Sequence, residues 1–172
     1  MKTISLWPDG TVMEYYPAEE RRTDACVVVF PGGGYVGRAP HEGRGYAEYL
    51  NAIGMDAFVC EYRVKEPDPE NPLYPWPLVD ARRAVRWVRS HAAAYGVDPH
   101  KIAVMGSSAG GHLAASVSAY TGSLPGETHD ETDAADCRPD ATICRRPSAP
   151  AAPEMISLDK TVPRFYIMCF II

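Results

Sequence analysis

The sequence predicts an α/β domain with a mostly parallel sheet. Short apolar, β-branched segments alternate along the chain with longer segments of helical periodicity, a pattern typical of parallel strands joined by crossover helices. Two glycine-rich turns, "PGGG" at 31–34 and "GSSAG" at 106–110, each follow an apolar segment. With 172 residues, 46% of them hydrophobic, the chain is long enough to bury the core of one domain.

The first expected elements are two strands separated by a helix. The segment 25–30, "ACVVVF", is predicted to be a fully buried strand because it is a short continuous run of apolar residues. A helix is expected within 43–54, closed by Gly54, and a second strand at 56–62, "DAFVCEY". Residues 65–77 hold five prolines and are therefore expected to form a loop.

A longer helix is predicted to open at Pro77 and to end at Gly96. Proline is favoured in the first turn of a helix and glycine directly after the last. A strand at 101–106, "KIAVMG", and a helix of small residues after Ser108 should follow. The apolar face of the helix that opens at Pro77 is predicted to consist of Leu78, Ala81, Val85 and Val88.

The pattern changes after residue 143. "DATI" at 140–143 begins another expected strand, but residues 144–154 contain three prolines and paired arginines, which argue against a central strand. Residues 164–172, "RFYIMCFII", are again apolar and strand-like. We therefore expect the N-terminal part of a domain at 1–143 and an aberrant or truncated tail at 144–172.

Composition narrows the class of partner. The formal net charge of −5, without a clustered basic face, gives no electrostatic reason to expect nucleic acid. The first residues lack the apolar segment of a signal peptide, and no apolar run is long enough to span a membrane, so a cytoplasmic protein with a small-molecule partner is expected. The five cysteines include no C-x-x-C pair, and Cys26 and Cys60 are predicted to be buried, reduced thiols.

The first glycine run has three interpretations. Gly32, Gly34 and Gly37 match the dinucleotide pattern G-x-G-x-x-G, with Glu61 near the position of a ribose-binding acid. Pro40 argues against a helix that begins inside the run and points at a pyrophosphate. The second interpretation is an oxyanion loop, in which backbone N–H groups stabilise a tetrahedral intermediate, and the third is a plain turn.

The second glycine turn matches a nucleophile elbow. In Gly106-Ser107-Ser108-Ala109-Gly110, only Ser108 has glycine at both flanking positions of G-x-S-x-G, so Ser108 rather than Ser107 is expected at the turn between strand and helix. An ordinary helix N-cap is the alternative for Ser108. The elbow is favoured because the glycine loop precedes it in the order that an α/β hydrolase requires.

Taken together, several segments resemble one family. "VVVFPGGGY", "RAPHEGRGYAEYL", "EYRV", "YPWPLVDARRAVRWVR", "YGVDPHKIAVMGSSAGGHLAA" and "CRPDATI" are similar to α/β-hydrolase esterases of the acetyl esterase and acetylxylan esterase type, near the hormone-sensitive-lipase group. The resemblance covers roughly residues 25–143 and implies a three-layer α/β-hydrolase fold, incomplete at its C-terminal side. It also implies hydrolysis of short acyl esters, such as acetylated sugars, without a metal or organic cofactor.

The resemblance assigns roles to individual residues. Ser108 would be the nucleophile, and the N–H groups of Gly33, Gly34 and Ala109 would form the oxyanion hole. Tyr35 and His41 are expected to contact substrate, with an ordinary helix-start position as the alternative for His41. Pro31 stands where many relatives carry the histidine of an H-G-G-G loop.

The catalytic base has no clear candidate. In this family the acid and then the histidine follow the serine, and only His112 and His129 do so here. His112 lies on the helix that the elbow serine points away from, and its ring is expected to pack against the sheet. His129 lies in an acidic loop predicted to be solvated surface. The acids after the serine that have no later histidine to orient are Asp130, Asp133, Asp136, Asp140 and Asp159.

We therefore expect a serine carboxylesterase lineage in which this chain lacks the triad Asp and His and has little activity alone. Residues 164–172 resemble the approach to the strand that carries the catalytic acid in relatives. An internal deletion followed by truncation, or a frameshift near residue 143, would each account for the tail. Two other functional classes stay open: an arylformamidase-like amidase or peptidase on the same fold, and a non-catalytic remnant.

Overall fold

A computed structural model describes residues 1–8, 10–127, 130–145 and 166–170, the last as backbone only. The described residues form one seven-stranded sheet in the order β1-β2-β4-β3-β5-β6-β7. The strands β3 to β7 run parallel, and β1 and β2 add an antiparallel edge. The strands are β1 (Lys2–Ser5), β2 (Val12–Tyr16), β3 (Cys26–Phe30), β4 (Asp56–Cys60), β5 (Ile102–Ser107), β6 (Ala141–Arg145) and β7 (Tyr166–Phe170).

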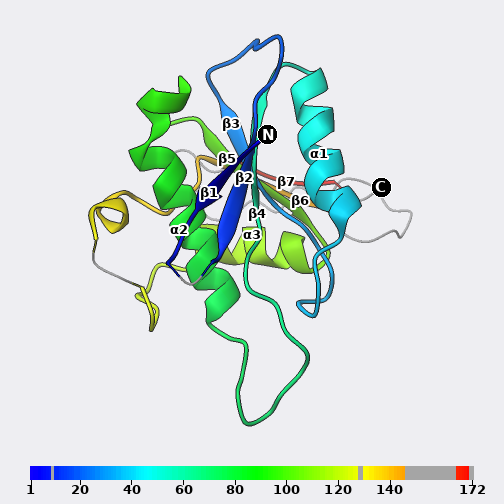
Figure 1. The fold of residues 1–172 in the computed structure, drawn as a ribbon, viewed down its shortest axis with the longest axis vertical. Helices are drawn as coiled ribbons and strands as arrows, with labels where there is room; N and C mark the ends of the chain where they lie inside the picture. The colour runs from blue at the N-terminus through cyan, green and yellow to red at the C-terminus, as the bar shows by residue number, and fades with distance from the viewer. Residues whose placement is uncertain (9, 128–129, 146–165, 171–172) are drawn as a thin grey trace.

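Helices cover both faces of this sheet. Helix α1 (Pro40–Ala52) connects β3 to β4, α2 (Trp76–Ser90) precedes β5, and α3 (Ala109–Ala119) connects β5 to β6. Right-handed crossovers that move in opposite directions along a sheet place their helices on opposite faces. Figure 1 accordingly shows α1 on one side of the sheet and α2 on the other, and α3 packs against α2.

The core has two parts because successive side chains of a strand point to opposite faces. Val28 and Phe30 of β3 belong to the larger cluster, with Leu78 of α2 and Leu113 of α3. Val27 and Val29 face α1 in a smaller cluster that includes Ala47 and Leu50. Every residue of β3 and β4 is buried, so the continuous apolar runs correctly predicted central strands.

Most predicted elements are present, with shifted bounds. Helix α1 begins earlier than expected, with Pro40 in its first turn, where a missing N–H has no cost. The predicted helix 77–96 ends at Ser90 and is followed by the short 3₁₀ helix η1 (Ala92–Tyr95). His91 ends α2 by stacking its ring on Trp87 and contacting the carbonyl oxygen of Trp87, and Gly96 then closes η1 with φ 63°.

The two N-terminal strands were not predicted from the sequence. β1 and β2 each bury a single residue, Ile4 and Met13, and leave the rest partly or fully exposed. Neither contains the continuous apolar run of a central strand. At the other edge, β6 runs through Arg145, two residues beyond 143, and pairs in parallel with β7, which lies inside the predicted strand 164–172.

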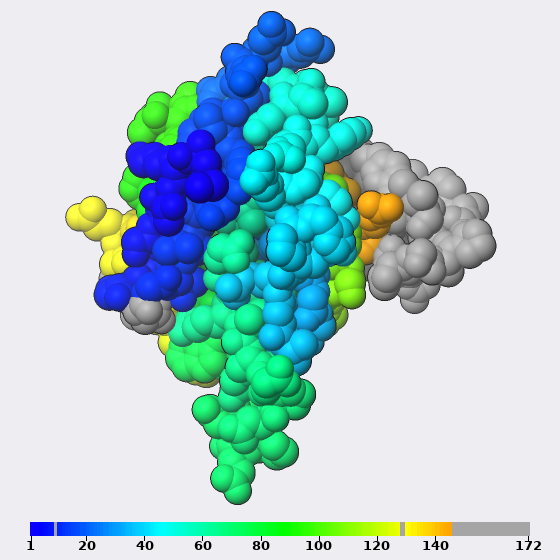
Figure 2. Space-filling model, turned by 45° about the vertical axis from the view of Figure 1, so that its right-hand side comes forward, coloured from blue at the N-terminus to red at the C-terminus, as the bar shows by residue number. Residues whose placement is uncertain are grey.

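The surface of the protein has a projecting loop and an apolar groove. The proline-rich segment between β4 and α2 is a loop that projects from the body of the protein (Figures 1 and 2). On the α1 side, a groove of about 810 Å³ runs between the helix and the strands β5 and β6. Tyr49 and Ile53 form its wall, and Met105 and Ile143 lie on its floor. Among the described residues, no helix is both long and apolar enough to cross a membrane.

Candidate active site

Ser108 lies at a tight turn between β5 and α3. Ser107 is the last residue of β5 and Ala109 the first of α3, and Ser108 between them has φ 53° and ψ −123°. A positive φ is costly for a residue with a side chain, and such strain is concentrated at functional sites. This is the geometry predicted for Ser108. The residue occupies the N-cap position of α3, but its side chain caps no helix N–H, so it is not an ordinary capping serine.

The two motif glycines are required by close packing. A Cβ on Gly110 would overlap the carbonyl oxygen of Phe30 and lie 2.9 Å from the carbonyl carbon of Pro31. A Cβ on Gly106 would lie 2.7 Å from the same Phe30 oxygen. The turn is therefore pressed against the end of β3, where the glycine run begins.

The backbone of Ser108 is fixed while its side chain is exposed. The Ser108 N–H donates to the carbonyl oxygen of Arg145 at 3.1 Å, and the Ser108 carbonyl accepts from the His112 N–H at 2.9 Å. The side chain is exposed, and within the described part of the chain its hydroxyl has no hydrogen-bond partner. A hydroxyl held out in this way is accessible to a substrate.

The glycine run lies next to this serine. A Cβ on Gly32 would lie 3.2 Å from the Ser108 Cβ, so the loop and the turn are in contact. Gly33, Gly34 and Tyr35 follow with φ values of 139°, 64° and 64°. The carbonyls of Gly32 and Gly33 accept from Ala39, Val36 and Gly37, which folds the loop back on itself.

Three N–H groups near Ser108 are available as donors. Among the described residues, the N–H groups of Gly33 and Gly34 have no acceptor, and that of Ala109 belongs to the first turn of α3, where helix donors have no intrahelical partner. These are the donors expected for an oxyanion hole. That all three point to one location stays a prediction.

Tyr35 and His112 meet at a cavity beside the turn. The Tyr35 hydroxyl lies 2.7 Å from His112 Nδ1, and the two rings are perpendicular. Burial raises the pKa of Tyr35 to about 12, so the hydroxyl stays protonated and can donate a hydrogen bond to an Nδ1 that carries no hydrogen. The cavity, of about 350 Å³, is lined by both residues and by apolar side chains that include Leu73, Leu78 and Leu113.

The expectation that His112 packs against the sheet is wrong. His112 is exposed, because the face of α3 that meets the sheet is formed by Leu113, Ala114 and Val117. His112 therefore projects sideways toward the glycine loop, where its Nδ1 contacts a phenol rather than a carboxylate.

His41 lies apart from Tyr35. It occupies the first turn of α1, where its side chain is 81% exposed, and it borders the groove on the α1 side rather than the Tyr35 cavity. The structure therefore does not bring the two expected substrate contacts to one cavity. His41 therefore fits the alternative expectation of an ordinary residue at the start of a helix.

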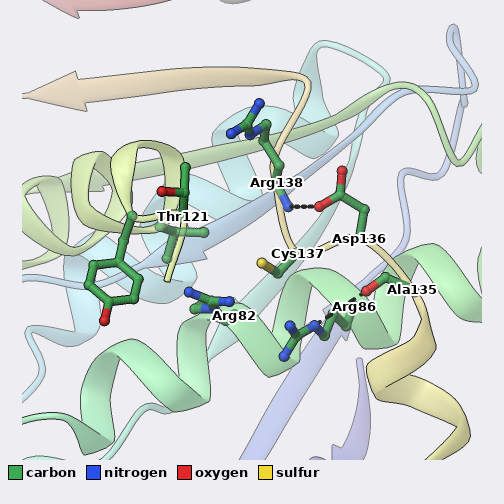
Figure 3. Close-up of a pocket in the computed structure, with 9 residues that line it drawn as sticks. Arg82, Arg86, Thr121, Ala135, Asp136, Cys137 and Arg138 are labelled. Carbon is green, nitrogen blue, oxygen red and sulfur yellow. Dashed lines mark hydrogen bonds between the residues drawn. The ribbon is translucent and has the colours of Figure 1, made fainter. Parts of the chain in front are cut away.

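Three of the candidate acids after Ser108 form ion pairs with α2, whereas the Asp136 carboxylate accepts the N–H of Arg138. Asp130 and Asp133 contact Arg83, and Asp140 contacts Arg89. Figure 3 shows the hollow between α2 and the segment before β6, with Arg82 and Arg86 directed into it. Both guanidinium groups contact Glu127, at 2.8 and 3.0 Å, so this hollow is an ion-paired contact between elements rather than an anion site. His129 and Asp159 lie outside the described residues.

The dinucleotide interpretation does not fit the structure. Helix α1 begins at Pro40, beyond all three glycines of the motif, so no helix N-terminus lies inside the run to bind a pyrophosphate. Glu61, the candidate ribose ligand, instead forms an ion pair with Arg38 at 2.5 Å. Cys26 and Cys60 are buried free thiols as expected, and burial raises the pKa of both.

Three side chains that bond the glycine loop or the end of β5 were not predicted from the sequence. Glu42 accepts the Gly32 N–H at 2.7 Å, Tyr62 donates to the carbonyl oxygen of Pro31, and the hydroxyl of Tyr46 lies 2.5 Å from that of Ser107. Glu42 and Tyr46 are four residues apart at the start of the helix that follows the glycine loop. That spacing was the available signal, because it places both on one face.

Comparison with known proteins agrees with this geometry. Residues 14–140 match the sequence model of the BD-FAE family. The chain is 36% identical over 122 residues to endo-1,4-beta-xylanase B of Butyrivibrio fibrisolvens, covering 71% of this chain and 19% of that protein. It is 32% identical over 117 residues to an acetylxylan esterase of Xylanibacter ruminicola, covering 67% and 23%.

Solved structures show the same fold. An acetyl ester-xyloside bifunctional hydrolase from Caldicellulosiruptor lactoaceticus superposes with a TM-score of 0.71 at 35% identity, covering 84% of this chain and 56% of that one. A thermophilic esterase from Thermogutta terrifontis gives 0.68 at 33% identity, covering 84% and 53%. The chain thus spans about half the length of these solved relatives and about a fifth of the two curated ones. It has an α/β-hydrolase fold and belongs to the BD-FAE family.

Proposed function

We propose that this chain carries the nucleophile and the oxyanion hole of a serine esterase that hydrolyses short acyl esters, with acetylated carbohydrates as the substrate class. The observation that carries the proposal is the strained, exposed Ser108 turn packed against the glycine loop. Relatives named as acetylxylan esterase and acetyl ester hydrolase support the choice of an acetyl group on a sugar.

In the proposed reaction, the Ser108 hydroxyl oxygen attacks the ester carbonyl carbon and loses its proton to a base. The carbonyl oxygen becomes an oxyanion that accepts hydrogen bonds from the N–H groups of Gly33, Gly34 and Ala109. Collapse of this intermediate expels the alcohol, which takes up a proton and leaves an acetyl-serine. Water then attacks the acetyl carbon, releasing acetate and restoring the Ser108 hydroxyl.

We assign no acid or base of the triad among the residues that the structure describes. His112 is poorly suited to act as the base, because its Nδ1 contacts the Tyr35 hydroxyl and, within the described part of the chain, no carboxylate contacts the ring. Without its base, a serine hydrolase loses roughly 10⁶-fold in turnover, so we expect residual hydrolysis only. Tyr35, at the rim of the apolar cavity, is proposed to contact the part of the substrate next to the acyl group.

The test compares three versions of the chain with p-nitrophenyl acetate, an acetylated xylan oligomer and a formanilide. We expect slow release of p-nitrophenol that Ser108→Ala abolishes and that Ser90→Ala, an exposed serine at the end of α2, leaves unchanged. Faster turnover of the formanilide than of the esters would favour the amidase alternative. Equal rates for Ser108→Ala and the unaltered chain would reject Ser108 as the nucleophile and favour a non-catalytic remnant.

A further inference from the structure

Helix α1 makes a contact with each of the two parts of the proposed site. Its first turns carry Glu42, which reaches the glycine loop, and Tyr46, which reaches the end of β5 beside Ser108. In an α-helix, residues four apart lie on the same face about 6 Å apart along the axis. The loop and the serine turn are therefore both bonded to one rigid element.

The Glu42 carboxylate has a specific partner in the loop. Its side chain is only 17% exposed, and Oε2 accepts the Gly32 N–H at 2.7 Å. The exposed His41 ring lies farther away, with Nε2 3.9 Å from Oε1. A largely buried carboxylate needs hydrogen-bond donors to offset its lost hydration, and here the loop supplies one.

Gly32 is the point where the carboxylate, the loop and the serine come together. A Cβ at this position would lie 2.5 Å from Glu42 Oε2 and 3.2 Å from the Ser108 Cβ. The Tyr62 hydroxyl donates to the carbonyl oxygen of the preceding Pro31. Side chains thus bond both the carbonyl oxygen and the N–H of the peptide group that joins Pro31 to Gly32. Among the described residues, the N–H groups of the next two residues have no such partner and are available as donors.

Tyr46 makes the matching contact on the serine side. Its hydroxyl lies 2.5 Å from that of Ser107, which is buried at the end of β5. Ser108 follows directly, at the strained turn. A shift of Tyr46 would therefore move the turn relative to the loop that Glu42 holds.

We propose that Glu42 and Tyr46 are positioning residues that hold the glycine loop and the Ser108 turn at a fixed separation. The contacts themselves are independent of the proposed function, but their catalytic consequence rests on it. Preorganised donors are effective only when they lie at hydrogen-bond distance from the developing oxyanion, and a displacement of about 1 Å costs up to about a hundredfold in rate.

The direct test is an NMR measurement that needs no enzymatic activity. In the unaltered chain, the Gly32 amide should exchange slowly with solvent, because Glu42 accepts its hydrogen bond. Glu42→Gln replaces the carboxylate with a neutral amide that accepts a weaker hydrogen bond, so Gly32 exchange should become faster by about threefold or more. Tyr46→Phe should leave Gly32 exchange unchanged and speed hydrogen exchange of the Ser108 amide by about tenfold.

Matched controls lie on the outer surface of the same helix. Glu48→Gln alters an exposed carboxylate that pairs with Arg44, and Tyr49→Phe alters a tyrosine that is largely exposed. Neither should change the exchange rate of the Gly32 amide or of the Ser108 amide. The proposal is overturned if the Gly32 amide exchanges at the same rate with Glu42→Gln as in the unaltered chain, or if Tyr46→Phe and Tyr49→Phe have the same effect on Ser108.

A kinetic measurement separates this proposal from the proposed function. If Ser108-dependent ester hydrolysis is detected, Glu42→Gln and Tyr46→Phe should each lower kcat by about tenfold or more and leave KM nearly unchanged. An unaltered kcat in both variants would overturn the positioning role. If no Ser108-dependent hydrolysis exists, the proposed function fails, and the NMR result still decides whether the two contacts hold the loop and the turn.

Discussion

The parallel strands of the sheet begin along one edge, the strand-start edge, and end along the opposite one, the strand-end edge. These two edges are built in opposite ways. At the edge where β4, β5 and β6 begin, acidic side chains are paired with bases: Asp56 with Arg21, Asp24 with Lys101, and Asp140 with Arg89. At the edge where β3 and β5 end, the chain instead presents consecutive glycines and a serine with φ 53°. The first edge satisfies its polar groups internally, and the second leaves donors and a hydroxyl exposed.

This difference separates stability from proposed chemistry. Asp56 is 1% exposed, and its carboxylate oxygens accept hydrogen bonds from Tyr15, the Ala18 N–H and Arg21. Ser108 retains an unfavourable backbone conformation that the surrounding contacts enforce. Substitutions at the strand-start edge should therefore change stability alone, and those at the strand-end edge should change the proposed chemistry.

The largest effect is expected from Gly110→Ala. The added methyl group would overlap the carbonyl oxygen of Phe30, which is backbone and cannot rotate away, so β3 and α3 must separate. We expect a loss of at least about 3 kcal/mol in the free energy of unfolding, measured by urea denaturation. Gly45→Ala is the control, because no atom lies within 4 Å of the added Cβ and α1 should gain up to about 1 kcal/mol. Equal effects of the two substitutions would contradict the close packing of the turn.

A smaller loss is expected from Asp56→Ala at the opposite edge. The substitution leaves Arg21 and Tyr15 without their shared acceptor. Because the Arg21 side chain is 33% exposed, water compensates part of the loss, and we expect about 2–3 kcal/mol. Asp24→Ala, which breaks an exposed pair with Lys101, should cost less than about 1 kcal/mol. A change in Ser108-dependent hydrolysis by Asp56→Ala would break the separation between the two edges.

The smallest effect is a pH dependence at the strand-start edge. The His100 N–H and the nearby Lys101 ammonium hold the pKa of Asp98 below its ordinary value. A carboxylate with a lowered pKa in the folded state stabilises the protein above its unfolded pKa of about 3.9, and this contribution is lost as the pH falls below that value. Thermal unfolding should therefore show the advantage of the unaltered chain over Asp98→Asn shrinking on acidification. An advantage that grows as the pH falls would reverse the assigned sign.

The sequence predicted the central strands and the serine turn because local patterns determine them. A continuous apolar run such as 25–30 is compatible with few environments other than a buried strand, and G-x-S-x-G specifies a turn that only glycines can flank. β1 and β2 were missed because each buries one residue and owes its place to pairing with other strands. The position of His112 was predicted wrongly because the small residues of α3 give the helix a weak apolar face. The spacing of Glu42 and Tyr46 indicates that they share one face of α1, but the partners of that face depend on how α1 packs across the sheet.

The central claim is that Ser108 is held in a strained conformation for a chemical purpose, and comparing Ser108→Gly with Ser108→Ala by urea denaturation tests it most directly. Both remove the hydroxyl, but only glycine adopts φ 53° without strain. We predict that Ser108→Gly is more stable than Ser108→Ala by about 1 kcal/mol, that Ser108→Ala is close to the unaltered chain, and that neither variant shows the Ser108-dependent hydrolysis. A Ser108→Gly variant no more stable than Ser108→Ala, or one that still hydrolyses p-nitrophenyl acetate at the original rate, would contradict the claim.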